Sequence, residues 1–330
     1  MEKVPDNSVR IKVTNDCQWT CTFCHNEGTE LPNSANANYR TSAFLDPNIL
    51  SLPIVENIIV SEDTIAAISN LKTIGIDEIH LTGGEPTLLP QLPSLIKVLS
   101  SQGFKVKLTT NGQVSNQRMQ EIIESGLDGI NFSILSLDED EFLKTQNPPM
   151  IPGLDPRRWA KNMIEREKSN ILLAVKLGVN VKINTAVLGK GDYSRVDSVR
   201  EFAQEEGITL VLLNGIGEQD TAQDAVFEYA QSYAEYRSSS ESSNNSKGSR
   251  TYAFPNGDVL RAKYLTNYHP EVVCGGCELR DTPLCAEKFY GIRMEFRGGT
   301  PFIRLCIQKT NERTVMPLQD FIAKDIKSQL

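Results

Sequence analysis

The chain has 330 residues, of which 39% are hydrophobic and 23% charged, and its net charge of −8 gives no overall basic field to attract nucleic acid or an anionic membrane. No apolar run approaches the ~18–20 residues that cross a bilayer. The N-terminal MEKVPDNSVR has no apolar segment of the kind found in signal peptides. We therefore expect a cytoplasmic protein with neither a nucleic-acid nor a membrane partner.

The first predicted strand, residues 9–14, leads into a loop that holds three closely spaced cysteines, Cys17, Cys21 and Cys24. In a four-iron cluster each iron usually takes one thiolate, so three cysteines leave one iron open to bind a cofactor or substrate. The spacing therefore predicts a 4Fe–4S cluster with an open site. A structural zinc held by the three cysteines and His25 is the alternative.

Helical and strand patterns alternate from this loop to residue 214. The predicted helices are 61–75, 92–103, 116–126, 157–177 and 193–207, and the further strands are 78–84, 105–112, 129–135, 180–188 and 208–214. Such alternation indicates an α/β fold with a parallel sheet and right-handed crossovers. Six units predict a partial (β/α)6 TIM-like barrel over residues 1–215, and a doubly wound sheet is the alternative. In both, ligands bind where the strands end.

The last third of the chain differs from this pattern. Residues 216–250 include RSSSESSNNSKGSR, which is too polar to pack, so we expect a linker or mobile loop there. Residues 251–330 are predicted to form a small domain that a metal centre helps to hold together. Its candidate ligands are Cys274, Cys277, Cys285 and Cys306. They predict an auxiliary 4Fe–4S cluster, with a structural zinc as the alternative.

The motif C-x3-C-x2-C after a first strand, with Phe23 before the third cysteine, resembles the signature of the radical S-adenosylmethionine (SAM) superfamily. GGEP resembles the turn at which that superfamily meets the methionine amino group of SAM. Glycines let backbone approach a ligand, and Glu85 would bring a negative charge near the ammonium. The resemblance implies that the cysteines of the first loop hold the cluster. It also implies SAM contacts at Gly83, Gly84, Glu85, Pro86, Thr110 and Ser133.

Residues 8–215 are further similar to the GTP 3′,8-cyclase (MoaA) family of molybdenum-cofactor biosynthesis, in segments such as VRIKVTNDCQWTCTFCHNEG, IGIDEIHLTGGEPTLL and LTTNG. That family lines a triphosphate site with arginines and carries a second cluster on three cysteines. This chain has four C-terminal cysteines, and two of the arginine positions are occupied by His80 and Val211. The residues that remain as substrate-binding candidates are Arg10, His80, Lys182 and Arg293.

The resemblance implies an enzyme that cleaves SAM with an electron from a donor such as flavodoxin or ferredoxin and removes hydrogen from a small, nucleotide-like molecule. Three alternatives stay open. They are the GTP 3′,8-cyclase reaction, modification of a peptide or natural product with a twitch- or SPASM-like C-terminal domain, and a non-catalytic zinc or iron–sulfur scaffold. The short stretch before residue 9 leaves no room for a winged peptide-binding region, which favours a small molecule. The sequence assigns no catalytic acid or base.

Overall fold

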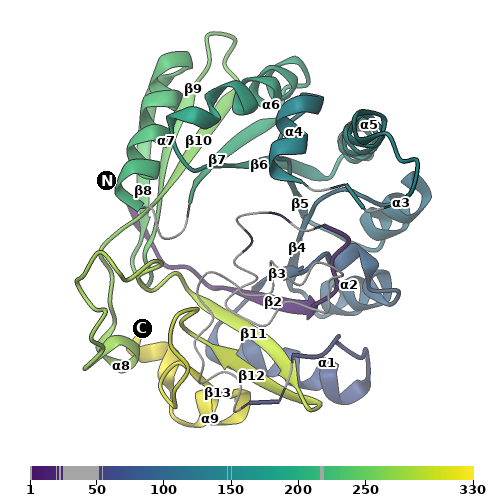
Figure 1. Ribbon diagram of the computed structural model, residues 1–330. Coiled ribbons are helices and arrows are strands. Elements are labelled where there is room, and N and C mark those ends of the chain that lie inside the picture. Colours follow the sequence, from purple (N-terminus) through teal and green to yellow (C-terminus); the bar gives the residue numbers. More distant parts are fainter. Residues whose placement is uncertain are drawn as a thin grey trace.

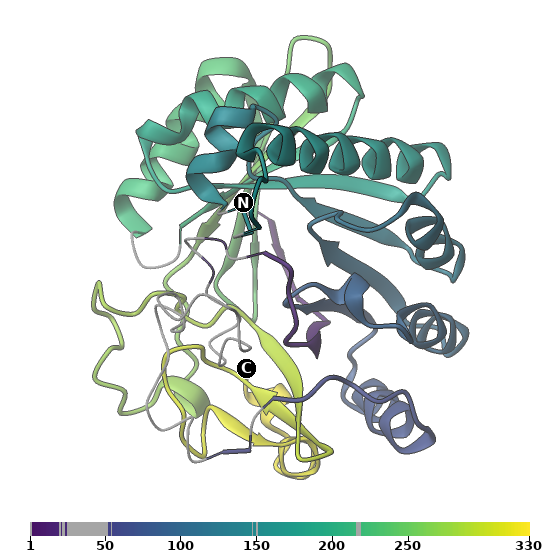
Figure 2. The same cartoon turned by 45° about the vertical axis from the view of Figure 1, so that its right-hand side comes forward.

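The computed structural model shows one curved sheet with helices on its outer face (Figures 1 and 2). The structure describes residues 2–19, 21, 24, 52–53, 55–146, 148–149, 151–215 and 219–330, and only the backbone for 219–221. Phe23 and His25, which contributed to the interpretation of the cysteine loop, lie outside the described residues.

Six parallel strands form the centre of the sheet. They are β2 (Ser8–Thr14), β3 (Glu78–Gly83), β4 (Lys105–Thr110), β5 (Gly129–Ser133), β6 (Asn180–Val187) and β7 (Thr209–Asn214). Each pairs in parallel with the next strand along the chain. Across the described residues the strand order is open, with β1 at one end and β13 at the other. The predicted partial (β/α)6 barrel is therefore confirmed.

Helices pack on the outer face of this sheet. They are α1 (Glu62–Ser69), α2 (Leu92–Ser101), α3 (Asn116–Glu124), α4 (Glu139–Thr145), α5 (Pro156–Lys176), α6 (Tyr193–Glu205) and α7 (Gln219–Tyr233). Ser115 and Asp155 cap α3 and α5 by accepting hydrogen bonds from backbone N–H groups of the first turn. Alternate strand residues such as Val9 and Ile11 are fully buried in the core, which places the intervening Arg10 on the inner face.

The C-terminal third extends the same sheet at both edges. Its elements are β8 (Glu235–Ser242), β9 (Lys247–Ala253), β10 (Val259–Leu265), α8 (Glu271–Cys274), β11 (Ile292–Arg297), β12 (Thr300–Arg304), β13 (Val315–Pro317) and α9 (Leu318–Ala323). β10 pairs in parallel with β7, and β11 pairs in parallel with β2. The segment that we expected to form a small separate domain therefore shares the sheet of the core.

The prediction of a linker or mobile loop at residues 216–250 is wrong for the part of that range that the structure describes. Helix α7 is followed by β8 and β9, which pair as an antiparallel hairpin, and β1 (Glu2–Val4) adds to the outer strand. A ladder is made by backbone groups, so it tolerates the Ser- and Asn-rich side chains of this segment. Apolar support comes from the fully buried Tyr252.

The tip of the β8–β9 hairpin is fastened to the start of the chain by Asp6. The Asp6 carboxylate accepts a hydrogen bond of 2.8 Å from Asn245 Nδ2 and pairs with Lys247 Nζ at 2.5 Å. Burial alone would raise the pKa of Asp6, but the charge of Lys247 and hydrogen bonds from Lys247 and Ser8 lower that pKa to about 2. The polar stretch is therefore fastened by a half-buried carboxylate in addition to its apolar support.

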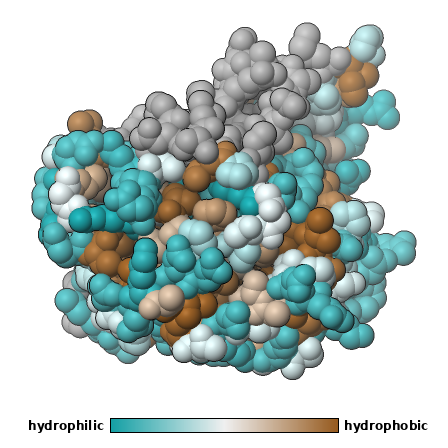
Figure 3. Space-filling model, turned by 90° about the horizontal axis from the view of Figure 1, so that it is seen from below, coloured by the Kyte–Doolittle hydropathy of each residue, from teal (hydrophilic) through white to brown (hydrophobic). Residues whose placement is uncertain are grey.

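The surface agrees with the charge-rich composition. Within the part of the chain that the structure describes, no helix is both long and apolar enough to cross a membrane. On the face shown in Figure 3, apolar residues are interspersed with polar ones. The large exposed apolar side chains, such as Ile59 and Leu284, lie far apart in the sequence.

Replacing Asp6 with Asn should destabilise the protein by about 2 kcal/mol at neutral pH, because folding lowers the pKa of this carboxyl from 3.8 to about 2. The stabilisation is complete above the unfolded pKa and is lost as the pH falls through the folded pKa. Urea unfolding at a series of pH values should show the D6N deficit narrowing below about pH 4.

Asp77→Asn is the matched control, because Asp77 is exposed. It should change the free energy of unfolding by less than about 0.5 kcal/mol. A D6N deficit that stays constant down to about pH 2 would show that the ionised carboxylate does not hold the hairpin.

Candidate active site

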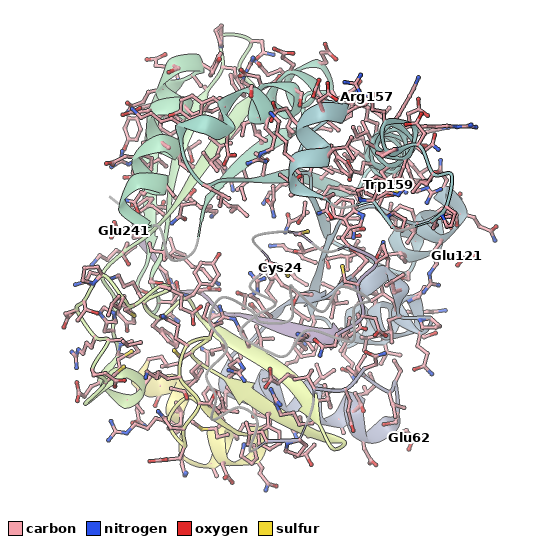
Figure 4. All side chains as sticks on the ribbon, viewed as in Figure 1. Cys24, Glu62, Glu121, Arg157, Trp159 and Glu241 are labelled. Carbon is pink, nitrogen blue, oxygen red and sulfur yellow. The ribbon has the colours of Figure 1, made fainter. Side chains whose placement is uncertain are left out.

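The cysteine loop leaves the end of β2, at the edge of the sheet where the parallel strands end. Trp19, between the first two cysteines, is 9% exposed and packs edge-on against Phe142 of α4, with ring centroids 5.8 Å apart. Cys17 and Cys21 contact the same small apolar cluster, to which α4 and α5 contribute. Cys24 is exposed and lies inside the curve of the sheet (Figure 4). Trp19 thus anchors the loop, while the third cysteine stays accessible.

The surroundings of the first two thiols suit metal-bound thiolates. Gln146 Nε2 donates to Cys21 Sγ at 2.8 Å, and Trp19 N donates to Cys17 Sγ at 3.4 Å. Burial raises the pKa of Cys17 to about 12 and also raises the pKa of Cys21. A metal cation reverses this effect, because it deprotonates the thiols that bind it. Hydrogen-bond donors directed at sulfur then stabilise the thiolate charge.

The GGEP turn after β3 lies directly against the start of the cysteine loop. Gly84 N donates to Thr14 O at 2.9 Å, and Glu85 N donates to Asp16 O at 2.7 Å. A Cβ on Gly83 would lie 2.4 Å from Thr14 O. A Cβ on Gly84 would lie 2.3 Å from Asp16 O. These two glycines let the neighbouring backbone approach, which only glycine permits. Their contact with SAM stays a prediction.

The Glu85 carboxylate joins the GGEP turn to the end of β4. It is 1% exposed, and four donors surround it. Oε1 accepts from Thr87 N at 3.0 Å, from Thr87 Oγ1 at 2.6 Å and from Thr110 Oγ1 at 2.6 Å. Oε2 accepts from Asn111 N at 2.7 Å. Burial raises the pKa of Glu85, and these hydrogen bonds oppose the rise. The protein itself therefore uses the acceptor capacity of this carboxylate.

The Glu85 side chain also caps the single turn Pro86–Leu88 (η5). Its contact with SAM stays a prediction. Gln18 Nε2 donates to Asn111 Oδ1 at 3.3 Å, which connects the cysteine loop to the same network. The cysteine loop, the GGEP turn and the end of β4 thus form one hydrogen-bonded unit.

The other predicted SAM contacts differ in their exposure to solvent. The Thr110 hydroxyl donates to Glu85 and accepts from Gly112 N at 3.0 Å, and the residue is 2% exposed. Pro86 is buried at the start of its turn. Ser133 is half-buried at the end of β5, in register with Asn184 on the inner face. Direct contacts of these three residues with a ligand stay predictions.

Three of the four predicted substrate-binding residues lie in one row across the inner face. Arg293 of β11 is in register with Arg10 of β2, which is in register with His80 of β3. Two of them already have anionic partners. His80 Nε2 lies 2.6 Å from Glu78 Oε1, and Arg293 forms a buried ion pair of 2.6 Å with Glu287. These pairs reduce the charge that this row offers to a substrate.

Lys182, the fourth candidate, lies on the inner face of β6 beside two cations that our sequence analysis did not single out. Arg261 and Lys263 belong to β10, where Leu260 and Ala262 are fully buried on the opposite face. The alternation of apolar and basic residues in VLRAKYL was the available signal for these two cations. We assigned that segment to a separate domain and therefore did not expect its charged residues to lie near the barrel strands.

The four C-terminal cysteines line one cavity of about 220 Å³. They are Cys274 at the end of α8, Cys277, Cys285 and Cys306, and only Cys285 is fully buried. Their backbone turns are tight, with Cys277 N donating to Cys274 O at 3.2 Å. Burial raises the pKa of Cys274 and of Cys306 to about 12. The cavity therefore gathers the thiols that we predicted to form a second metal centre.

Among the described His, Cys, Asp and Glu side chains, no group of three is arranged as a site for a metal ion. A zinc site requires four ligands at about 2.0–2.3 Å from one point. In a four-iron cluster each iron usually takes one thiolate, so both cysteine groups fit such a cluster by number and chemistry.

Replacing Gly84 with Ala should destabilise the site, because its Cβ would overlap the backbone oxygens of Asp16 and Asn15. We expect a loss of about 1–3 kcal/mol in the free energy of unfolding, measured by urea denaturation. Gly189→Ala is the control, since this glycine has extended backbone and nothing within 4 Å of the new methyl group. Equal stabilities of the two variants would contradict the close approach of turn and loop.

Comparison with known proteins agrees with this arrangement. The profile of the Radical SAM superfamily matches residues 11–203. Over 214 residues, 63% of this chain, it is 30% identical to a protein of Sulfurisphaera tokodaii named “Probable GTP 3′,8-cyclase”. A protein of the same name from Methanothermobacter thermautotrophicus is 26% identical over 228 residues, 68% of this chain. The chain spans 56% and 63% of the length of these two relatives.

The fold is also shared with a solved structure. The crystal structure of Streptococcus suis SuiB bound to S-adenosylmethionine aligns with 98% of this chain and 65% of its own, with a TM-score of 0.55 and 15% sequence identity. The superfamily profile covers more than half of this chain and includes both the cysteine loop and the GGEP turn. The chain therefore belongs to the radical SAM superfamily of enzymes.

Proposed function

We propose that this protein cleaves SAM reductively and uses the resulting radical to remove hydrogen from a small-molecule substrate. One observation carries the proposal. Cys17, Cys21 and Cys24 lie in a loop that is hydrogen-bonded to the GGEP turn at the edge where the parallel strands end. Three cysteines complete all but one corner of a four-iron cluster, so this edge can hold both the cluster and a cofactor bound to its open iron.

Cys17, Cys21 and Cys24 would hold the cluster, which would pass one electron to SAM from a reduced donor, flavodoxin or ferredoxin in our prediction. Reductive cleavage of SAM would then supply the radical chemistry that removes hydrogen from the substrate. The chain's own residues hold and orient these partners. Gly83, Gly84 and Glu85 fix the loop that carries the cluster ligands. The inner face of the sheet, with Arg10 and Lys182, binds the substrate. We place this activity in the cytoplasm.

We also propose that the C-terminal cysteines hold an auxiliary 4Fe–4S cluster. Four thiols around one cavity of about 220 Å³ support this assignment. Four thiolates can ligate all four irons, which suits a structural or electron-transfer role better than direct binding of substrate.

Anaerobic reconstitution with iron and sulfide should give about eight irons per chain, four for each cluster. Cys17→Ala/Cys21→Ala/Cys24→Ala should retain about four irons and form no 5′-deoxyadenosine from SAM and dithionite, because the cluster with the open iron is lost. Cys274→Ala/Cys277→Ala should also retain about four irons but still cleave SAM. Iron analysis and chromatography of the nucleoside measure both quantities.

Each variant controls for the other, since both lose cysteines and only one loses the proposed open cluster. A colourless protein with stoichiometric zinc would contradict both assignments and favour a scaffold. SAM cleavage that survives the triple substitution would contradict the assignment of the N-terminal loop.

The GTP 3′,8-cyclase reaction is a second candidate, because the relatives reported above carry that name. The inner face gives it limited support. Burial lowers the pKa of His80, which is bonded to Glu78, and Arg293 is paired with Glu287, so neither residue offers an unpaired positive charge to a triphosphate.

Incubation of the reconstituted protein with SAM and dithionite, with and without GTP, tests this candidate. We expect 5′-deoxyadenosine formation to rise less than about twofold with GTP, because two of the four predicted substrate-binding residues, His80 and Arg293, provide no unpaired positive charge. A rise of an order of magnitude or more, with a matching loss of GTP, would establish the cyclase reaction instead. A parallel incubation with a small-molecule extract shows whether another compound stimulates the cleavage.

A further inference from the structure

Strand β10 brings two cations to the inner face of the sheet. Leu260 and Ala262 are 0% exposed and belong to the core, where α7 packs against β10. Side chains alternate along a strand, so Arg261 and Lys263 point to the opposite, inner face. Both are half-buried there.

The strand register places Arg261 level with the edge where SAM is expected to bind. Ser133 of β5 is in register with Asn184, Asn184 with Val211, and Val211 with Arg261. A row across four neighbouring strands thus connects Arg261 to Ser133, a predicted SAM contact. A substrate group held at β10 would lie on the same face of the sheet as the cofactor.

Lys182 of β6 and the cations of β10 share the inner face, with one strand, β7, between them, and their like charges act on one another. Burial lowers the pKa of Lys263 to about 8, and the charges of Arg261, Lys182 and Lys247 contribute to the shift. Burial also lowers the pKa of Lys182, with a further contribution from Arg261. Lys182, Arg261 and Lys263 are therefore one cluster of like charges in a partly desolvated place.

Other cations of the inner face have carboxylate partners. Lys107 pairs with Glu78 at 2.5 Å, and Lys247 pairs with Asp6 at 2.5 Å. Across the described residues, no ion pair or hydrogen bond joins Lys182, Arg261 or Lys263 to a carboxylate, and Arg261 Nε is buried without a hydrogen-bond partner. Such a cluster destabilises the fold unless an anion neutralises it.

We propose that Lys182, Arg261 and Lys263 form an anion site on the inner face, which binds a phosphate or carboxylate group of the substrate. The inference rests on the proposed function, since it assumes that the substrate binds to this face. This site would supply positive charge that the row of Arg293, Arg10 and His80 lacks, because Glu78 and Glu287 are already bonded to His80 and Arg293. Arginine and lysine together provide forked and point-charge donors for such a group.

Thermal unfolding of the full-length, reconstituted protein in a concentration series of inorganic phosphate or malonate, at constant ionic strength, tests the site. Wild type should show a Tm that rises with the anion. In Lys263→Gln and Arg261→Gln the apparent dissociation constant should be about tenfold higher. A stronger response to phosphate identifies a phosphorylated substrate, and a stronger response to malonate identifies a carboxylate.

The same variants carry a second signature. Without added anion, K263Q should have a Tm equal to or above that of wild type, because one repelling charge is gone; a cation with a structural partner would lower the Tm when removed. Lys97→Gln, on the exposed face of α2, is the control and should match wild type in both measurements.

Two results would overturn the inference. They are the absence of any anion response in wild type, and an equal response in wild type, K263Q and R261Q. Cleavage of SAM by the wild-type protein is measured separately. If wild type cleaves SAM but the anion response does not depend on β10, only this inference fails. If wild type does not cleave SAM, the proposed function itself fails.

Discussion

The close approach of two backbone segments is the constraint on which the rest of the site depends. Gly83 and Gly84 bring the end of β3 against residues 14–16, where any side chain would collide with main-chain oxygens. This contact fixes where the cysteine loop begins. Glu85 then ties the same turn to β4 through buried hydrogen bonds, so these segments from neighbouring strands are held together. Metal ligands need such fixed geometry, because small displacements weaken every bond to the metal at once.

The outer face of the sheet contributes mainly to stability, and the inner face carries the charged residues of the site. On the outer face, fully buried Val, Ile and Leu residues pack beneath helices and supply the hydrophobic free energy of folding. On the inner face, charged residues are partly desolvated, and most lie in pairs such as Lys107 with Glu78. A strand that alternates strictly can serve both faces, as β10 does with its apolar and basic residues. In our proposal, the cations of β10 give up stability for binding.

The sequence predicted those features that local pattern determines. The expected helix at 157–177 is α5 at Pro156–Lys176, and the expected strand at 129–135 begins as β5 does, at Gly129. Burial imposes the period of two or 3.6 on the residues themselves, so such elements can be read directly. The three cysteines of the first loop could also be identified from the sequence, because they lie within a few residues of one another.

Features that depend on distant partners could not be read in this way. The role of Glu85 is decided by Thr110 and Asn111, which reach it only once β3 and β4 are paired. The Ser- and Asn-rich hairpin was missed because its polar composition indicates weak side-chain packing. Its ladder is formed by backbone groups instead, and Asp6 fastens it. The inner-face cations of β10 were missed because the pairing of β10 with β7 skips α7, β8 and β9 in the chain.

The chain between β10 and β11 crosses from one edge of the parallel strands to the other, since β10 adjoins β7 and β11 adjoins β2. Cys274, Cys277 and Cys285 all lie on this crossing segment. The auxiliary cluster that we propose would therefore fasten the piece of chain that connects the two ends of the parallel array.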